Sequence, residues 1–62
     1  MTQKELLYLE DAVGHEASIL EILNESLKQV DDENIVTFLE EEIDKHKSIK
    51  KELIILMEDK SE

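Results

Sequence analysis

The stretch Asp31-Asp32-Glu33-Asn34 is the only convincing break in a sequence that otherwise has a helical pattern. Aspartate and asparagine side chains accept hydrogen bonds from the free N–H groups at a helix start, and negative charge suits the positive end of the helix dipole. The chain has no proline, and its one glycine, Gly14, lies far from this stretch. We therefore predict a turn at about residues 31–33 between a helix over about 3–30 and a helix over about 34–59.

Apolar residues recur at alternating steps of three and four on both sides of the predicted turn, which is the spacing of one helix face. In the first helix these residues are Leu6, Leu9, Val13, Leu20, Leu23, Leu27 and Val30. In the second helix they are Ile35, Leu39, Ile49, Leu53 and Leu56. A second set widens both faces beyond a simple coiled-coil seam and comprises Tyr8, Ala12, Ile19, Ile22, Val36, Phe38, Ile43 and Met57. Each helix is therefore expected to contact more than one neighbour.

Two long helices joined by a short turn form an antiparallel hairpin. Thr2 and Glu5 have the spacing of a capping box, which predicts that the first helix begins near residue 3. A chain of 62 residues buries only about 60% of its unfolded surface when it folds alone, and one hairpin leaves half of each wide face in water. Two hairpins complete a four-helix bundle. The sequence predicts a single all-α domain over residues 1–62, which forms a homodimeric four-helix bundle.

The composition excludes several classes of function. Seventeen acidic and seven basic residues give a formal charge of −10, which disfavours binding to nucleic acids or anionic membranes. The sequence has no cysteine. No apolar run is long enough to span a bilayer, and the first residues lack the pattern of a secretory signal, so we expect a cytoplasmic protein. Phosphate-binding loops, dinucleotide fingerprints and nucleophile elbows are absent from the sequence. Whether the chain is an enzyme stays open.

Ionisable residues interrupt the apolar alternation near the middle of each helix: Glu16 in the first, Glu42 and His46 in the second. A buried carboxylate is costly unless it has a partner. Counted from the turn, Glu16 and His46 both lie about 20 Å along their helices, so they should sit side by side, with Glu42 one turn away on the same face. A two-fold axis at mid-height would bring the same three residues of a second copy into this layer. Glu16, His46 and Glu42 are our predicted metal ligands, with His15 in an outer role.

Four glutamates and two histidines on facing helices are the ligands of a dinuclear carboxylate site. The chain resembles a half-length ferritin-like di-iron or di-manganese carboxylate bundle, in which each helical pair supplies one Glu and one Glu-x-x-His motif. The segments Lys4-Glu-Leu-Leu-Tyr-Leu-Glu-Asp-Ala-Val-Gly-His-Glu16 and Asp44-Lys-His46 are also similar to short bacterial spore-coat proteins of the coat-F type. This resemblance implies an iron or manganese site with Glu16 and His46 as ligands in a spore-associated bacterial protein; zinc is expected less, and would be structural. The sequence departs from the family pattern at Glu42-x-x-x-His46, where Ile43 takes the place of the family's glutamate.

Two alternatives to a metal site follow from the same residues. Glu16 and His46 as a hydrogen-bonded pair would set the register of the helices and bind nothing, as isolated polar core residues do in coiled coils. The chain would then be a plain oligomerisation domain or an interaction module, for example a component of a larger assembly with a protein partner. Leu7 and Ile54 fall outside the predicted core stripes and would supply an exposed contact for that partner.

Overall fold

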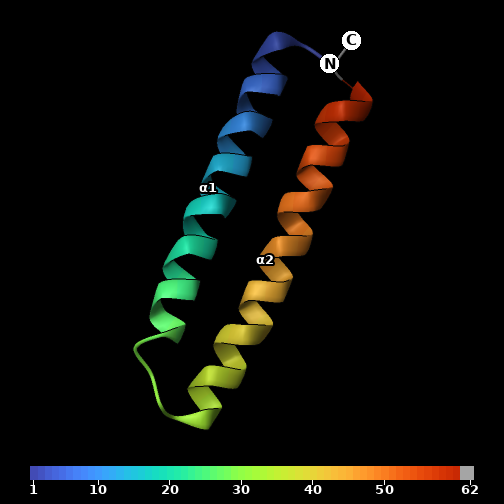
Figure 1. Ribbon diagram of the computed structural model, residues 1–62. Coiled ribbons are helices and arrows are strands. Elements are labelled where there is room, and N and C mark those ends of the chain that lie inside the picture. The colour runs from blue at the N-terminus through green and yellow to red at the C-terminus, as the bar shows by residue number, and fades with distance from the viewer. Residues whose placement is uncertain (61–62) are drawn as a thin grey trace.

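The computed structural model describes residues 1–60 of the chain as two long helices that form an antiparallel hairpin (Figure 1). Helix α1 spans Gln3–Leu27 and helix α2 spans Glu33–Lys60. The start of α1 and the end of α2 lie at the same end of the hairpin, opposite the turn. This confirms the all-α hairpin predicted from the sequence. Residues 61 and 62, which the prediction included in the same domain, lie outside the described residues.

Helix α1 begins with the predicted capping box. The Glu5 backbone N–H donates to Oγ1 of Thr2 at 3.1 Å, and the Thr2 N–H donates to Oε1 of Glu5 at 2.8 Å. Hydrogen bonding by the Thr2 backbone N–H first, and then by the Thr2 side chain, lowers the pKa of the exposed Glu5 carboxyl below its usual value, because the charged form is the better acceptor. The two residues satisfy backbone and side-chain groups that a helix start would otherwise leave to water.

The turn between the helices begins earlier than predicted. α1 ends at Leu27 because the next two N–H groups, of Lys28 and Gln29, donate to the carbonyls three residues back at 3.2 and 2.9 Å. Such tighter bonds close the last turn of a helix and stop its propagation. The connection therefore occupies residues 28–32, and the predicted extension of the first helix to about residue 30 is wrong.

Asp32 provides the N-terminal cap of α2. Its Oδ1 accepts the backbone N–H of Asn34 at 2.8 Å and that of Ile35 at 3.3 Å. Its backbone carbonyl accepts the N–H of Val36 at 2.9 Å, which is the first bond of the helical ladder. The aspartate of the predicted break therefore starts the second helix, as its preference for this position suggests.

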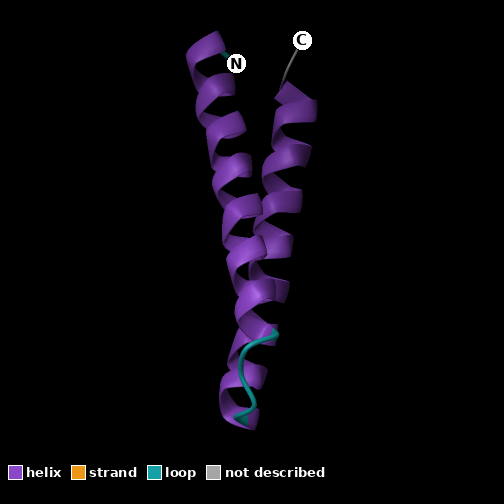
Figure 2. Ribbon diagram, turned by 60° about the vertical axis from the view of Figure 1, so that its left-hand side comes forward, coloured by secondary structure: helices purple, strands orange, loops and turns teal. Residues whose placement is uncertain are grey.

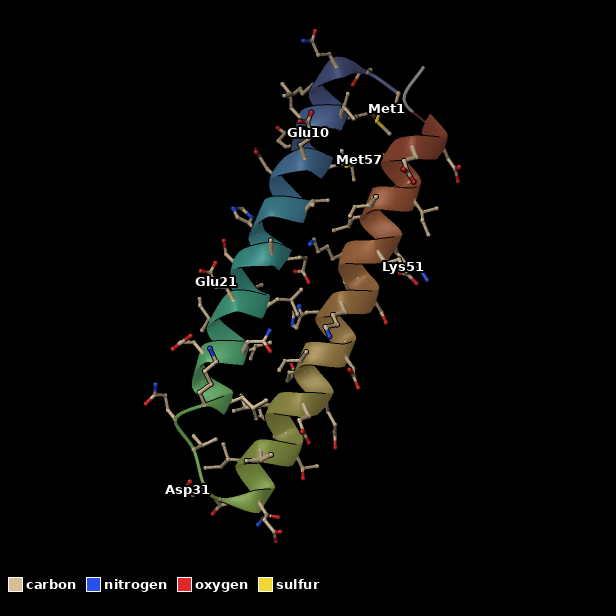
Figure 3. The ribbon with its side chains drawn as sticks, in the orientation of Figure 1. Met1, Glu10, Glu21, Asp31, Lys51 and Met57 are labelled. Atoms are coloured by element: carbon tan, nitrogen blue, oxygen red, sulfur yellow. The ribbon has the colours of Figure 1, made fainter. Side chains whose placement is uncertain are left out.

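The seam between the helices follows a heptad pattern on both sides. On α1 it consists of the predicted stripe, Leu6, Leu9, Val13, Glu16, Leu20, Leu23 and Leu27, all partly buried. On α2 it consists of Val36, Leu39, Ile43, His46, Lys50, Leu53 and Met57. The predicted α2 stripe was one position off at Ile35, Ile49 and Leu56, and Ile35 and Leu56 are 47% and 41% exposed. On α2, the row that contains Ile35 and the row that contains Val36 are both rich in apolar residues, and the hairpin buries only the row that faces α1. Figure 3 shows Met57 between the helices and Glu21 on the side of α1 away from α2.

The hairpin is a thin rod with very little core. Its Cα atoms extend over 46 × 14 × 10 Å, and the two helix axes are inclined to each other (Figure 2). The radius of gyration is 14.4 Å, against about 10.6 Å for a compact domain of this length. Among the described residues, only Leu39 and Ile43 are buried, with 9% and 6% of their surface exposed. No helix in residues 1–60 is long and apolar enough to cross a membrane.

Candidate functional site

The two helices are joined at mid-height by Glu16 and His46. The Nδ1 atom of His46 and the Oε1 atom of Glu16 are 2.6 Å apart, which is the distance of a short, charge-assisted hydrogen bond. Both side chains are largely shielded from water, with 14% of Glu16 and 19% of His46 exposed. Each residue occupies a seam position, where the neighbouring seam residues Val13, Leu20 and Ile43 help to exclude solvent. The structure thus brings together Glu16 and His46, which were predicted to lie side by side because they are at similar distances from the turn.

Glu42 lies on the other side of the imidazole, one helical turn below His46. Its Oε1 is 3.7 Å from Nε2 of His46, and 28% of its side chain is exposed. This separation is too long for a hydrogen bond. The imidazole of His46 is therefore flanked by carboxylates at both ring nitrogens, with close contact at Nδ1 and a gap at Nε2.

His15 lies apart from this group. It precedes Glu16 on α1 and is exposed, and no hydrogen bond or ion pair links it to Glu16, Glu42 or His46 in the described part of the chain. Adjacent residues on a helix differ by about 100° in direction, which accounts for its position beside the seam. Its predicted outer role stays a prediction.

A single hairpin offers few ligands to a metal ion. In residues 1–60, no group of three or more His, Asp or Glu side chains is arranged to hold a metal. If Nδ1 of His46 stays bonded to Glu16, a single chain presents only Nε2 of His46 and the carboxylate of Glu42. Metal ions in proteins usually take at least four ligands, so further ligands must come from another molecule or from water.

The row of residues one position before the seam forms a second, uncovered side of the hairpin, which we call the apolar face. Its apolar members are Tyr8, Ala12, Ile19 and Ile22 on α1, and Ile35, Phe38, Ile49 and Leu56 on α2. The polar residues Glu5, His15, Ser26, Glu42, Lys45 and Glu52 lie in the same row between them. Each row is turned by about 100° from its seam in the same sense about its own chain direction. Because the helices are antiparallel and face each other, this rotation brings both rows to the same side of the hairpin. A shallow hollow between Tyr8 and Leu56, also lined by Met1, Glu5 and Leu9, connects the two rows at the open end.

The apolar face is strongly exposed. Ile22 is 64% exposed, Tyr8 62% and Phe38 57%. The row one position after the seam is mostly polar, and we call it the polar face. On α1 it includes Leu7, Glu10, Gly14, Ala17, Glu21 and Asn24. On α2 it includes Thr37, Glu40, Asp44, Lys47, Lys51, Ile54 and Glu58. Leu7 and Ile54, the residues predicted to contact a protein partner, lie on this polar face. The apolar side chains that need covering are therefore concentrated on one side.

The site residue Glu42 belongs to the same row as the apolar face. It lies four residues after Phe38 and seven before Ile49, so its position on the helix surface is between them. The Nε2 atom of His46 points toward it. The open half of the ionisable cluster thus borders the surface that the hairpin leaves uncovered.

Comparison of the chain with protein-family models, with characterised proteins and with solved structures finds no match. The ferritin-like resemblance consequently has no support from a family match, and the helical hairpin is the part of that expectation that is shown.

Proposed function

We propose that the chain is an association module: two copies pair through their apolar faces to form a homodimeric four-helix bundle. The observation that carries this proposal is the concentration of exposed Tyr8, Ile22, Phe38 and Leu56 on one side of the hairpin. Monomeric soluble proteins seldom leave a contiguous apolar surface of this kind in water, and such surfaces mark association sites.

The surface area supports pairing with a second copy. The chain exposes 4935 Å², whereas a compact monomer of 7.2 kDa exposes roughly 4,100 Å². The excess of roughly 800 Å² is close to the area that each partner buries in a standard protein interface. A two-fold axis allows the same face of both copies to supply that interface.

Within such a module, the Glu16–His46 pair sets the height at which the helices pack. Apolar contacts along a heptad seam are similar from one turn to the next, so they allow slippage by a turn. A buried polar pair is satisfied in only one alignment, and it penalises the others. This is the role that the 2.6 Å contact supports without any ligand.

The test compares oligomeric state and stability in two matched double variants. Ile22→Gln with Phe38→Gln alters the apolar face, and Leu7→Gln with Ile54→Gln alters the polar face by the same chemistry. Light scattering after size exclusion should give a dimer for the native chain and for the polar-face variant, and a monomer or unfolded chain for the apolar-face variant.

A second measurement does not depend on whether a variant folds. The melting temperature of the unmodified chain, followed by circular dichroism, should rise with protein concentration, because dilution favours dissociation of a dimer. A monomer whose melting temperature is independent of concentration would refute the proposal. If the native chain is a monomer alone and forms a complex only with a different protein, the apolar face would be the binding surface for that protein.

Metal binding is a second candidate function, favoured by the meeting of Glu16, His46 and Glu42 in one layer. As a ferritin-like site, the dimer would hold one or two iron or manganese ions, with oxygen chemistry if coordination positions stay open. Native mass spectrometry before and after anaerobic addition of ferrous iron tests this function. A mass gain of one or two metals per dimer supports it, and an unchanged dimer counts against it.

A further inference from the structure

The two nitrogens of His46 have unequal surroundings. A neutral imidazole carries one N–H, and the 2.6 Å contact to the Glu16 carboxylate requires that hydrogen at Nδ1. The lone pair of Nε2 then faces the Glu42 oxygen at 3.7 Å. A lone pair on His46 Nε2 and the carboxylate oxygen of Glu42 then lie on either side of a small gap, and both would attract a cation.

We propose that His46 Nε2 and the Glu42 carboxylate of two copies together bind one divalent transition-metal ion at the centre of the dimer. Glu16 is a positioning residue here: it holds the Nδ1–H and does not touch the metal. This arrangement assigns Glu16 differently from the ferritin-like expectation, in which it is a ligand. The inference rests on the homodimer proposed above, because one chain presents only two of the four ligands.

The position of the cluster suits a site shared by two copies. His46 is the fourteenth of the 28 residues of α2, so the cluster lies at mid-height of the hairpin. Glu42 borders the apolar face, through which the copies pair. When like faces stack about a two-fold axis along the bundle, or across it at mid-height, the two clusters come to the same level. The pairing then places two imidazoles and two carboxylates around one point.

The distances and ligand types define the class of metal. Bonds of about 2.0–2.2 Å in a tetrahedral site separate neighbouring N and O ligands by about 3.4 Å, so the 3.7 Å gap needs to close by only a few tenths of an ångström. Two imidazoles and two carboxylates suit zinc, iron, cobalt or manganese. Magnesium and calcium prefer oxygen ligands alone, and should bind poorly. A histidine that donates its other nitrogen to a carboxylate is the usual arrangement at metal sites.

The test is titration of the full chain with Zn²⁺ and, separately, with Co²⁺, followed by calorimetry and native mass spectrometry, with Mg²⁺ as the control ion. We expect one Zn²⁺ per two chains, a higher melting temperature with Zn²⁺, and visible Co²⁺ absorption typical of tetrahedral coordination. Glu42→Gln and His46→Asn should abolish binding. Glu41→Gln, which removes the same charge one residue away, should leave it unchanged.

Glu16 is tested separately because its role is indirect. Glu16→Gln should weaken Zn²⁺ affinity about 10- to 100-fold while keeping the stoichiometry and the Co²⁺ spectrum. Loss of the spectrum in this variant would make Glu16 a ligand and overturn its assignment as a positioning residue.

The remaining outcomes separate this inference from the proposed dimer. A dimer that binds no Zn²⁺ overturns the metal site and leaves the association module intact, with the Glu16–His46 pair setting the register of the helices. One ion per chain, or binding that survives Glu42→Gln, overturns the shared site. A chain that remains monomeric with Zn²⁺ present overturns both.

Discussion

Nδ1 of His46 lies 2.6 Å from Oε1 of Glu16, although 30 residues separate them in the sequence. This contact links α1 to α2 at mid-height, in a seam whose other residues are mostly apolar. It gives the hairpin a polar contact that depends on alignment, whereas the leucine contacts around it depend mainly on area.

The first prediction concerns this pair. Glu16→Leu alone should destabilise the fold by about 1–3 kcal/mol, because Nδ1 of His46 loses its acceptor in the seam. Glu16→Leu with His46→Leu should cost much less than the sum of the single changes, since apolar residues of similar size often replace a buried pair without loss. Urea unfolding at one protein concentration, in the presence of a chelator, measures all three variants. Additive effects would show that the two side chains do not interact.

The second prediction concerns Gly14, which lies in the middle of α1 on the polar face. A Cβ built at this residue meets nothing within 4 Å. Gly14→Ala should stabilise the helix by about 1 kcal/mol, because alanine loses less backbone entropy in a helix interior. A thermal melt at fixed concentration checks the sign. A destabilised variant would indicate that another molecule packs closely against this part of the polar face.

The third prediction concerns the start of α2. Asp32→Ala removes the acceptor of the Asn34 and Ile35 N–H groups and should cost about 1 kcal/mol. Asp31→Ala removes the same charge from the neighbouring residue and serves as the control. Urea unfolding of both variants should show the larger loss for Asp32→Ala, and equal losses would argue that net charge, not the cap, is responsible.

The fourth prediction concerns pH. Hydrogen bonds from the Thr2 backbone and side chain lower the pKa of Glu5 in the folded chain. A lowered folded pKa means that the capping contribution is complete above the unfolded value near 4.5 and is lost as the pH falls through the folded pKa. An NMR titration of the Glu5 carboxyl should give a lower midpoint in the folded chain than in the urea-unfolded chain. Identical midpoints would show that the capping box is not formed in solution.

The fifth prediction concerns the two buried side chains of the described residues. Leu39→Ala or Ile43→Ala should each destabilise the chain by about 2–5 kcal/mol, because the space is not refilled. Leu7→Ala, at a residue that is 53% exposed, is the matched control and should cost far less. Urea unfolding midpoints give the comparison. A Leu7→Ala loss as large as that of Leu39→Ala would place Leu7 in an interface.

Much of the candidate site followed from counting along the chain. Glu16 and His46 stand at equal heights from the turn, and helix geometry converts equal heights into a contact. The end of α1 did not follow from this counting, because Val30 continues the apolar spacing beyond the last helical turn. Local i to i−3 bonds at Lys28 and Gln29 end the helix there, and side-chain periodicity does not report them.

The sequence by itself determined the helices, the capping residues and the level at which Glu16 and His46 meet, because these depend on spacing along one chain. Only the tertiary structure decided which apolar row of α2 faces α1, which nitrogen of His46 contacts Glu16, and which side of the hairpin stays uncovered. Each of these depends on the rotation of each helix about its own axis relative to the other helix. Val36, Leu39 and Ile43 bury well against α1, whereas Ile35 and Phe38 are equally apolar but face outward, so pattern alone does not distinguish the rows.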